Sequence, residues 1–196
     1  MPSLVGPARS AGSLRALAQP HLDLDDGLVL RPWLAADADV VKRAFDCPDV
    51  QRWHVRRMDG LAEARAWVGE WARRWEAETD GSWAVAGRAD DRPVGQVGLR
   101  MISLGVASAH LSYWVVPEAR GAGVAVRATR AVARWSFDVL GLHRLVLQHS
   151  TANSASCRVA AKLGFAVEGT ERGAARHADG WHDMHVHGRL RTDPPF

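Results

Sequence analysis

The chain has 196 residues, of which 47% are hydrophobic and 24% are charged, and its formal net charge is +3. These values are typical of one globular domain and exclude an intrinsically disordered or collagen-like chain. No internal period recurs, and no run of about 18 apolar residues is present, so we expect neither a repeat protein nor a membrane-spanning helix. The positive charge is spread from Arg9 to Arg191, which does not indicate a nucleic-acid-binding stripe.

The amino-terminal segment differs in composition from the rest of the chain. Residues 1–26 are rich in Ala, Ser, Gly and Pro and poor in β-branched and aromatic residues. We expect a flexible N-terminal extension over residues 1–26, followed by a single domain over residues 27–196. No continuous apolar stretch follows the first arginines, so a secretory signal is not expected. Two cysteines, Cys47 and Cys157, are too few for a disulfide framework and predict a reducing, cytoplasmic compartment.

The domain is predicted to begin with a short strand and two helices. The strand spans residues 28–33, and the first helix spans residues 37–45. A longer helix is predicted over residues 61–78, where three tryptophans recur at every fourth position: Trp67, Trp71 and Trp75. This spacing places them along one face of the helix. It indicates a stripe in the core or in a substrate groove, with cofactor stacking as the alternative.

The rest of the domain mixes strands and helices. Predicted strands span residues 82–87, 94–104, 109–116, 143–148, 165–168 and 182–188, and predicted helices span residues 121–140 and 153–163. The middle of the chain therefore contains two strand–helix units. This order predicts a mixed α/β (α+β) fold with a central sheet.

The segment between the strand at 109–116 and the helix at 121–140 has the chemistry of an anion-binding loop. Gly121 and Gly123 permit backbone conformations and close approaches that other residues do not. The first amides of the following helix have no partners within the helix, and the helix dipole adds positive potential there. The segment lacks the Gly-Lys-Ser/Thr of a Walker loop, and Val126 replaces the third glycine of the dinucleotide pattern. The remaining interpretations are a site for a diphosphate and a plain strand–helix turn.

A series of short motifs resembles those of one enzyme family. The pattern Arg120-x-x-Gly123-x-Ala125, after a strand that ends in Tyr-Trp-Val-Val-Pro-Glu, resembles the coenzyme A signature of the GNAT superfamily of N-acetyltransferases. Further motifs follow in the order of that family: Gly141–Leu145, Asn153–Ser156, Lys162–Phe165, Glu168–Gly169 and Asp179–Asp183. Together they cover residues 28–190. The array is similar to the RimJ/RimL-type branch, which acetylates the N-termini of ribosomal proteins.

The resemblance implies a fold, an activity and partners. The fold would be a GNAT fold, a mixed central sheet of about seven strands with splayed central strands and about four flanking helices. The activity would be transfer of an acetyl group from acetyl-CoA, the co-substrate, to a primary amine by direct attack and without a metal. The acceptor would be a protein or peptide N-terminus; an antibiotic or polyamine acceptor and a catalytically silent CoA-binding regulatory domain are the alternatives. A homodimer is also implied, whereas a nucleic-acid or membrane partner is not.

The resemblance also implies which residues bind the cofactor. The backbone of Val115 and Val116 would pair with the pantetheine arm in the opening between the splayed strands. The pyrophosphate would be wrapped by a run of backbone amides: Arg120, Gly121, Ala122, Gly123, Val124 and Ala125. Asn153 would hydrogen-bond the pantetheine. Its position also suits a helix N-cap, and the two roles are compatible.

The catalytic residues implied by the resemblance are Ser156, His110 and Asn153. The leaving sulfur benefits from a proton donor, because a thiol has a pKa of about 8.5. The tyrosine of many relatives is replaced by Ala160, so Ser156 is the predicted donor, with a capping residue as the alternative. His110 stands where relatives often carry a glutamate and is the predicted base, with a harmless exposed histidine as the alternative. Residues 173–176 contain no carboxylate, so an acidic residue that some relatives carry there has no counterpart.

A metal site is not expected from the last strand alone. Three polar residues alternate along it and share one face: Asp183, His185 and His187. Ligands on one strand rarely converge on a metal without help from elsewhere, for which His177 or His182 would be needed. Substrate contact or solvent exposure is therefore the favoured interpretation. Cys157 lies in a predicted helix without an evident activating base, so we expect a buried or cofactor-adjacent thiol rather than a nucleophile.

Overall fold

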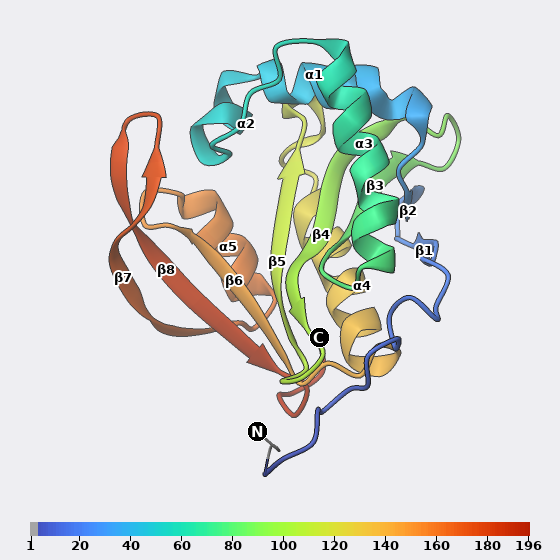
Figure 1. Ribbon diagram of the computed structural model, residues 1–196. Coiled ribbons are helices and arrows are strands. Elements are labelled where there is room, and N and C mark those ends of the chain that lie inside the picture. The colour runs from blue at the N-terminus through green and yellow to red at the C-terminus, as the bar shows by residue number, and fades with distance from the viewer. Residues whose placement is uncertain (1–3) are drawn as a thin grey trace.

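The computed structural model describes residues 4–196, which form one sheet with helices on both of its faces (Figure 1). The strands are β1 (Leu22–Asp23), β2 (Leu28–Pro32), β3 (Gly81–Gly87), β4 (Pro93–Ser103), β5 (Ser108–Val115), β6 (Arg144–Ser150), β7 (Ala166–His177) and β8 (Gly180–Leu190). The α-helices are α1 (Ala38–Asp46), α2 (Pro48–Trp53), α3 (Leu61–Glu76), α4 (Val124–Asp138) and α5 (Ser154–Lys162). Short 3-10 helices span Ala35–Asp37 and Pro117–Ala119. The number of elements is slightly larger than the resemblance implied.

The strands follow the order β1-β2-β3-β4-β5-β6-β8-β7 across the sheet. All neighbouring strands are antiparallel except β5 and β6, which are parallel. Because two parallel strands need a crossover, the chain passes from β5 to β6 through α4, which covers one face of the sheet. The predicted mixed α+β fold is therefore confirmed.

The two parallel strands in the middle of the sheet separate along their length. Their pairing begins at Ser108 opposite Arg144 and ends at Leu111 opposite Leu147. Beyond these residues β5 continues along β4, and β6 continues along β8, so the two strands diverge (Figure 1). The splayed central strands implied by the resemblance are present, and their unpaired edges face each other across the opening.

Two apolar clusters fill the two faces of the sheet. One cluster joins α4 to the sheet and contains Val132 of α4 and Leu145 of β6. The other cluster joins α1 and α3 to the opposite face and contains Phe45 of α1 and Trp114 of β5. Because β5 contributes side chains to both clusters, its alternate residues pack on opposite faces of the sheet.

The tryptophan stripe of α3 belongs to the core. Trp67 packs edge-on against Trp71 in the cluster shared with α1, at 5.0 Å between ring centroids. Trp75 lies in the other cluster and contacts Trp83 and Trp135. Of the three interpretations offered by the spacing, the structure supports a core stripe.

Two elements differ from the sequence-based expectation. Helix α2 was not expected, because six residues are too few to display a helical period. Strand β7 was expected to end at Glu168 but continues to His177 as half of a hairpin with β8. Its residues are almost all exposed, so no alternation of apolar side chains marks it. No helix within residues 4–196 is long and apolar enough to cross a bilayer.

The described part of the expected flexible extension packs along the domain. Leu14 is fully buried in the core cluster of α4. The indole N–H groups of Trp75 and Trp83 donate to the backbone carbonyls of Leu17 and Pro20, respectively. The low β-branched content of residues 1–26 concealed these contacts, since they use one leucine and backbone groups. Residues 1–3 lie outside the described part of the chain.

Candidate active site

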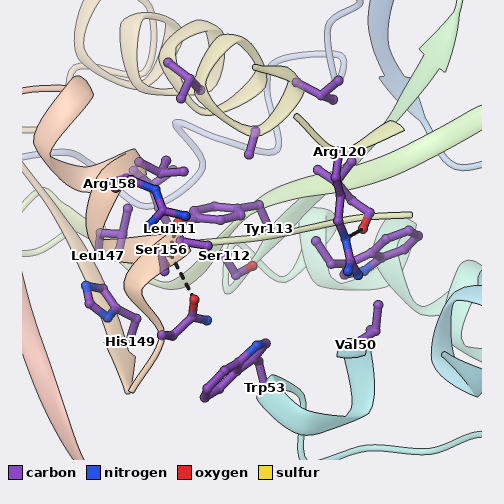
Figure 2. A pocket seen from close by; sticks show the side chains of 18 of the residues that line it. Val50, Trp53, Leu111, Ser112, Tyr113, Arg120, Leu147, His149, Ser156 and Arg158 are labelled. Carbon is purple, nitrogen blue, oxygen red and sulfur yellow. Dashed lines mark hydrogen bonds between the residues drawn. The ribbon is translucent and has the colours of Figure 1, made fainter. Parts of the chain in front are cut away.

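An open cleft of about 820 Å³ lies where β5 and β6 separate. Its walls come from both strands, from the loop before α4, from α5 and from α2, with His177 and Met184 of the β7–β8 hairpin at its border. Figure 2 shows Tyr113 and Ser156 inside the cleft, with Trp53 of α2 across from them. Two separated strands offer unpaired backbone groups with which an extended ligand can pair.

The loop before α4 has the conformation that an anion cradle requires. Gly121 and Gly123 have φ angles of +81° and +74°, in the left-handed region that favours glycine. Gly123 is the N-cap of α4 and supplies no side chain to satisfy the first amides of the helix. These amides, with the dipole of a helix that runs from Val124 to Asp138, favour a negative charge at the cleft.

Arg120 connects this loop to β5 and to α2. Its Nε donates to the carbonyl of Val115 at 3.0 Å, and its guanidinium bonds the carboxylate of Asp49 in α2 at 2.7 Å. On the opposite side, Arg158 and Lys162 of α5 line the cleft (Figure 2 labels Arg158). The loop end of the cleft therefore carries positive charge on two sides, which suits a polyanionic ligand.

Val115 and Val116, which were predicted to act together, have different positions. Val115 lines the cleft. Val116 is 6% exposed, does not line the cleft, and donates its N–H to the carbonyl of Val94 at 3.0 Å. Its own carbonyl accepts from Ala119, in the turn that Pro117 begins. Both backbone groups of Val116 are used within the protein, so the structure favours Val115 over Val116 for pairing with the pantetheine arm.

Ser156 and Tyr113 form a hydroxyl pair in the cleft. Their oxygens are 2.6 Å apart, and Ser156 is 8% exposed. Burial raises the pKa of Tyr113 to about 12, so its hydroxyl stays protonated. The sequence analysis missed Tyr113, although it is the one tyrosine of the chain and shares a strand face with Leu111. The phenol therefore comes from β5 rather than from α5, where Ala160 stands.

Asn153 occupies the position expected of a helix cap. Its side-chain oxygen accepts the backbone N–H of Ser156 at 3.0 Å, at the N-terminus of α5. Asn153 also lines the cleft. The capping role is confirmed, and the contact with pantetheine stays a prediction.

His110, the predicted base, does not line the cleft. It is paired with Arg100 on one side and with Val146 on the other, in the part of the sheet where β5 and β6 are still joined. Burial lowers the pKa of His110, and the neighbouring Arg144 lowers it further. The strand at 109–116 was predicted, but the position at which β5 and β6 separate is set by tertiary pairing that the sequence does not display.

His177 brings an imidazole to the cleft instead. Its Nδ1 lies 3.0 Å from the carbonyl of Arg52, and because a carbonyl can only accept, Nδ1 carries the proton. Its Nε2 is buried and has no hydrogen-bond partner among the described residues. His177 lines the cleft, and Nε2 is the nitrogen of its ring that has no partner there. Residues 169–177 were not expected to form a strand, so the sequence did not indicate that His177 lies at the cleft.

A second histidine lies beside His177. The ring of His182 is 4.3 Å from that of His177 between centroids. Ser150 accepts the N–H of Ala152 and donates to Nδ1 of His182 at 2.7 Å. Nε2 of His182 in turn donates to Asp179 at 2.8 Å. This series of hydrogen bonds orients polar groups next to the unpartnered nitrogen of His177.

His54 completes the wall formed by α2. Burial lowers the pKa of His54 to about 4, although a hydrogen bond with the backbone of Tyr113 opposes this effect. The imidazole is therefore neutral near pH 7 and connects the end of α2 to β5. A base whose conjugate acid is this strong is poorly suited to remove a proton from an ammonium group.

The cleft fits the donor that the resemblance implied. The left-handed glycines and free amides before α4 fit a diphosphate, and the unpaired edges of β5 and β6 fit an extended amide-containing arm. The Tyr113–Ser156 pair fits a sulfur that gains negative charge as it leaves. These are features of the chain itself, and together they suit acetyl-CoA.

Comparisons with known proteins agree with this fit. A family model described as an acetyltransferase (GNAT) domain matches residues 27–166. YoaA of Bacillus subtilis, an uncharacterized N-acetyltransferase, is 26% identical over 148 residues, which cover 75% of this chain and 84% of YoaA. Among solved structures, the ribosomal-protein-S5-alanine acetyltransferase of Vibrio fischeri superposes with a TM-score of 0.80 at 19% identity, over 89% of this chain and 98% of the other. Mycobacterium smegmatis RimJ gives a TM-score of 0.77 at 22% identity, over 87% and 86%.

The family model covers most of the chain, and the fold, the splayed strands and the glycine loop agree with it. The chain belongs to the GNAT family and is an N-acetyltransferase that uses acetyl-CoA as its acetyl donor.

Proposed function

We propose that the chain transfers the acetyl group of acetyl-CoA to the α-amino group of a peptide or protein N-terminus. One observation carries this choice of acceptor: among the described residues, the only carboxylate that lines the cleft is Asp49, which is already paired with Arg120. A polyamine or an aminoglycoside carries several positive charges and would favour several carboxylates. A peptide N-terminus presents one amine, which a neutral wall of tryptophan, histidine and serine accommodates.

The names of two structural neighbours support the same choice. The Vibrio fischeri protein is named as an acetyltransferase of an alanine in ribosomal protein S5. RimL, with a TM-score of 0.78 at 17% identity, is named as an α-N-acetyltransferase of ribosomal protein L7/L12. Both names describe proteins as acceptors, and the second specifies the α-amino group.

Bound acetyl-CoA supplies a thioester carbonyl that an amine can attack. The chain would hold the diphosphate with the amides that follow Gly121 and Gly123, and would hold the arm along the free edge of β5. Fixing the donor in this way removes most of the entropic cost of bringing two reactants together. The acceptor would enter from the side of α2 and the β7–β8 hairpin, where Trp53 and His177 form the border.

His177 would act as the general base. Its Nδ1 bonds the Arg52 carbonyl, and its Nε2 has no hydrogen-bond partner among the described residues. An attacking amine must lose a proton, and this nitrogen can accept it directly or through one water. His182 and Asp179, whose hydrogen bond lies beside the His177 ring, would stabilise the resulting positive charge.

The Ser156–Tyr113 pair would donate a proton to the leaving sulfur. Whichever hydroxyl donates within the pair, one O–H is left to point into the cleft. That O–H can donate to a departing thiolate. Cys157 does not line the cleft, so attack by the amine on the thioester needs no acetyl-cysteine.

A panel of amines tests the acceptor. Release of free CoA is followed with peptides that begin in alanine, serine or methionine, with spermidine and with an aminoglycoside, and products are identified by mass spectrometry. Peptides with a free N-terminus should react, and the same peptides with a blocked N-terminus should not. Higher kcat/KM for spermidine or the aminoglycoside would contradict the proposal and favour a small-molecule acceptor. CoA binding without turnover of any amine would favour a regulatory CoA-binding domain.

A further inference from the structure

Four side chains that the reaction does not use converge between the sheet and α5. They are His149 of β6, His185 and His187 of β8, and Cys157 of α5. One ligand atom from each lies within 4.8 Å of those of the other three. Among the described residues, this is the group of histidine, cysteine and carboxylate side chains whose geometry can hold a metal ion.

The strand register explains why the histidines meet. His149 is directly opposite His185 in the β6–β8 ladder, and His187 is opposite Leu147. Leu147 and His149 are two residues apart and share the sheet face that α5 covers, so His185 and His187 share it as well. Alternation along β8 alone did not predict convergence. The missing ligands come from a neighbouring strand and from a helix.

The two inner histidines face each other through the nitrogens that bind metals. Nε2 of His149 lies 3.1 Å from Nε2 of His187. Nδ1 of His149 lies 2.8 Å from the carbonyl of Ser150, to which it must donate, so Nε2 of His149 carries a lone pair. Two nitrogens in this position share either a proton or a cation. A backbone carbonyl that fixes the tautomer of a ligating histidine is a common feature of metal sites.

We propose that His149, Cys157, His185 and His187 form a binding site for a zinc ion. Zinc prefers four nitrogen and sulfur ligands in a tetrahedron, with bond lengths of about 2.0–2.1 Å to nitrogen and about 2.3 Å to sulfur. These lengths place neighbouring ligand atoms about 3.3–3.6 Å apart, so closure from 4.8 Å needs small rotations only. On binding, the Cys157 thiol releases one proton to solvent and its sulfur donates an electron pair to the metal.

The chemistry of the donor set selects the metal. The cluster contains no carboxylate, so calcium and magnesium, which require oxygen ligands, are poor candidates. With four protein ligands there is no open position for water, so the site is structural rather than catalytic. The ion would tie α5, which carries Asn153 and Ser156, to β6 and β8. The proposal is independent of the identity of the acceptor.

Metal analysis of the whole, tag-free protein tests the site. The protein is stripped with a chelator, loaded with zinc or cobalt, and freed of excess ion. We expect one zinc per chain by elemental mass spectrometry, together with a rise in melting temperature on zinc addition. Cobalt should give the strong visible bands of tetrahedral cobalt and a thiolate-to-cobalt charge-transfer band.

Matched variants identify the ligands. Cys157→Ser should remove the charge-transfer band, and Cys157→Ser and His185→Gln should each weaken zinc binding by about 100-fold or more, which exceeds the usual effect of losing a supporting residue. Both residues are half-buried, and circular dichroism checks that the variants fold. Cys47→Ser, at the other half-buried free cysteine, should leave binding and spectrum unchanged. Absence of stoichiometric zinc in the wild type, or an unchanged cobalt spectrum in Cys157→Ser, overturns the proposal.

Discussion

At the scale of single residues, the proposed donor of a proton to the leaving sulfur is a pair of hydroxyls, one of which the sequence motifs did not indicate. A buried phenol with a raised pKa holds its proton firmly, and it meets Ser156 at 2.6 Å. Tyr113 thus fixes the Ser156 hydroxyl, and the pair offers one O–H to the cleft. The phenol that many relatives place on the helix after Asn153 has an equivalent on β5 in this chain.

The first prediction tests this pair. Ser156→Ala should lower kcat by about 100-fold or more, because a proton donor to the leaving group is lost. CoA affinity should change little, since Asn153 bonds the backbone N–H of Ser156, which alanine retains. Tyr113→Phe should have a smaller effect, and the double variant should be no worse than Ser156→Ala alone. Saturation kinetics and CoA titration calorimetry measure both quantities. An unchanged kcat in Ser156→Ala would reduce Ser156 to a structural residue.

The second prediction concerns the base. Nε2 of His177 is the atom proposed to accept the proton of the amine, so a side chain without a basic nitrogen should slow the reaction. His177→Gln can still donate an N–H to the Arg52 carbonyl but cannot act as a base. It should lower kcat/KM by about 100-fold, as steady-state kinetics with a peptide acceptor measure.

His110→Gln is the control for this prediction, because His110 lies outside the cleft. It should keep the wild-type kcat/KM. His182, Arg52 and Trp53 contact His177, and His54 lies close enough to interact with its charge; all four are retained in both variants. A large loss of kcat/KM in His110→Gln, with the wild-type rate in His177→Gln, would restore His110 as the base.

At the scale of elements, the parts that the sequence predicted well are those with a local signal. Glycines and an apolar strand mark the loop before α4, and apolar periodicity marks α3 and α4. Helix α2 and most of β7 lack such signals, since one is a six-residue helix and the other an exposed polar strand. Both border the cleft and carry Trp53 and His177. The glycine loop of the cleft could therefore be predicted, whereas the wall formed by α2 and β7 depended on tertiary packing.

The third prediction separates the effect of Gly123 on CoA binding from its effect on folding stability. Gly123→Ala forces a Cβ into a backbone with φ of +74°, which costs about 1–2 kcal/mol of folding stability. It should also weaken CoA binding by at least about 10-fold, a change of about 1.4 kcal/mol in binding free energy. Gly123→Glu, which adds a negative charge, should abolish the rise in melting temperature that CoA produces.

Gly27→Ala is a matched control for the cradle. Gly27 has φ of +73° and nothing within 4 Å of the added Cβ, so the strain is the same and the cleft is untouched. It should lose similar stability and keep the full thermal shift with CoA. If Gly123→Ala and Gly27→Ala bind CoA equally well, or if the wild type shows no shift, the loop does not hold the diphosphate.

The fourth prediction concerns the connection between α2 and β5 through His54. Burial lowers the pKa of His54 to about 4, below the value of about 6.5 for an unfolded chain. As the pH falls from about 6.5 to 4, the unfolded state takes up a proton that the folded state does not. Stability is therefore complete above this window and is lost as the pH falls through it, by at most about 3 kcal/mol.

Urea denaturation between pH 7 and pH 4 measures this effect as the free energy of unfolding. His54→Gln should flatten the decline, because the glutamine does not titrate. A smaller slope should remain, since burial also lowers the pKa of His149 and of His187. An identical slope in wild type and His54→Gln would show that His54 is as accessible to protons as in the unfolded chain.

At the scale of the whole molecule, the separation of β5 from β6 creates the cleft that the candidate site residues line. The sheet is continuous from β1 to β7, but β5 and β6 pair only as far as Leu111 and Leu147. Below this point the pairing gives a rigid base that holds His110 inside the sheet. Above it, residues of the loop before α4, of α5, of α2 and of the β7–β8 hairpin line the cleft. The motifs of the sequence indicated the parts of this arrangement, and the long-range pairing decided which parts meet.

The last prediction concerns the amino-terminal segment, whose composition suggested a flexible extension. In the structure, the carboxylate of Glu78 accepts the backbone N–H groups of Gly12, Leu14 and Arg15 at 2.6–3.2 Å. Leu14 is fully buried in the main core cluster. We therefore expect Leu14→Ala to lower the free energy of unfolding by about 2–5 kcal/mol, the usual cost of a buried leucine. Deletion of residues 1–26 should lower it further.

Leu4→Ala supplies the matched control, because Leu4 is fully exposed and should be silent. Chemical denaturation of the three variants gives the free energies. None of residues 4–26 lines the cleft, so each folded variant should keep the wild-type KM for acetyl-CoA at a temperature well below its midpoint. A deletion variant as stable as the full chain would mean that the segment is the flexible extension its composition predicts. A destabilised Leu14→Ala would instead move the start of the folded domain from residue 27 to the segment around Gly12, since a side chain can lend stability only where it is held.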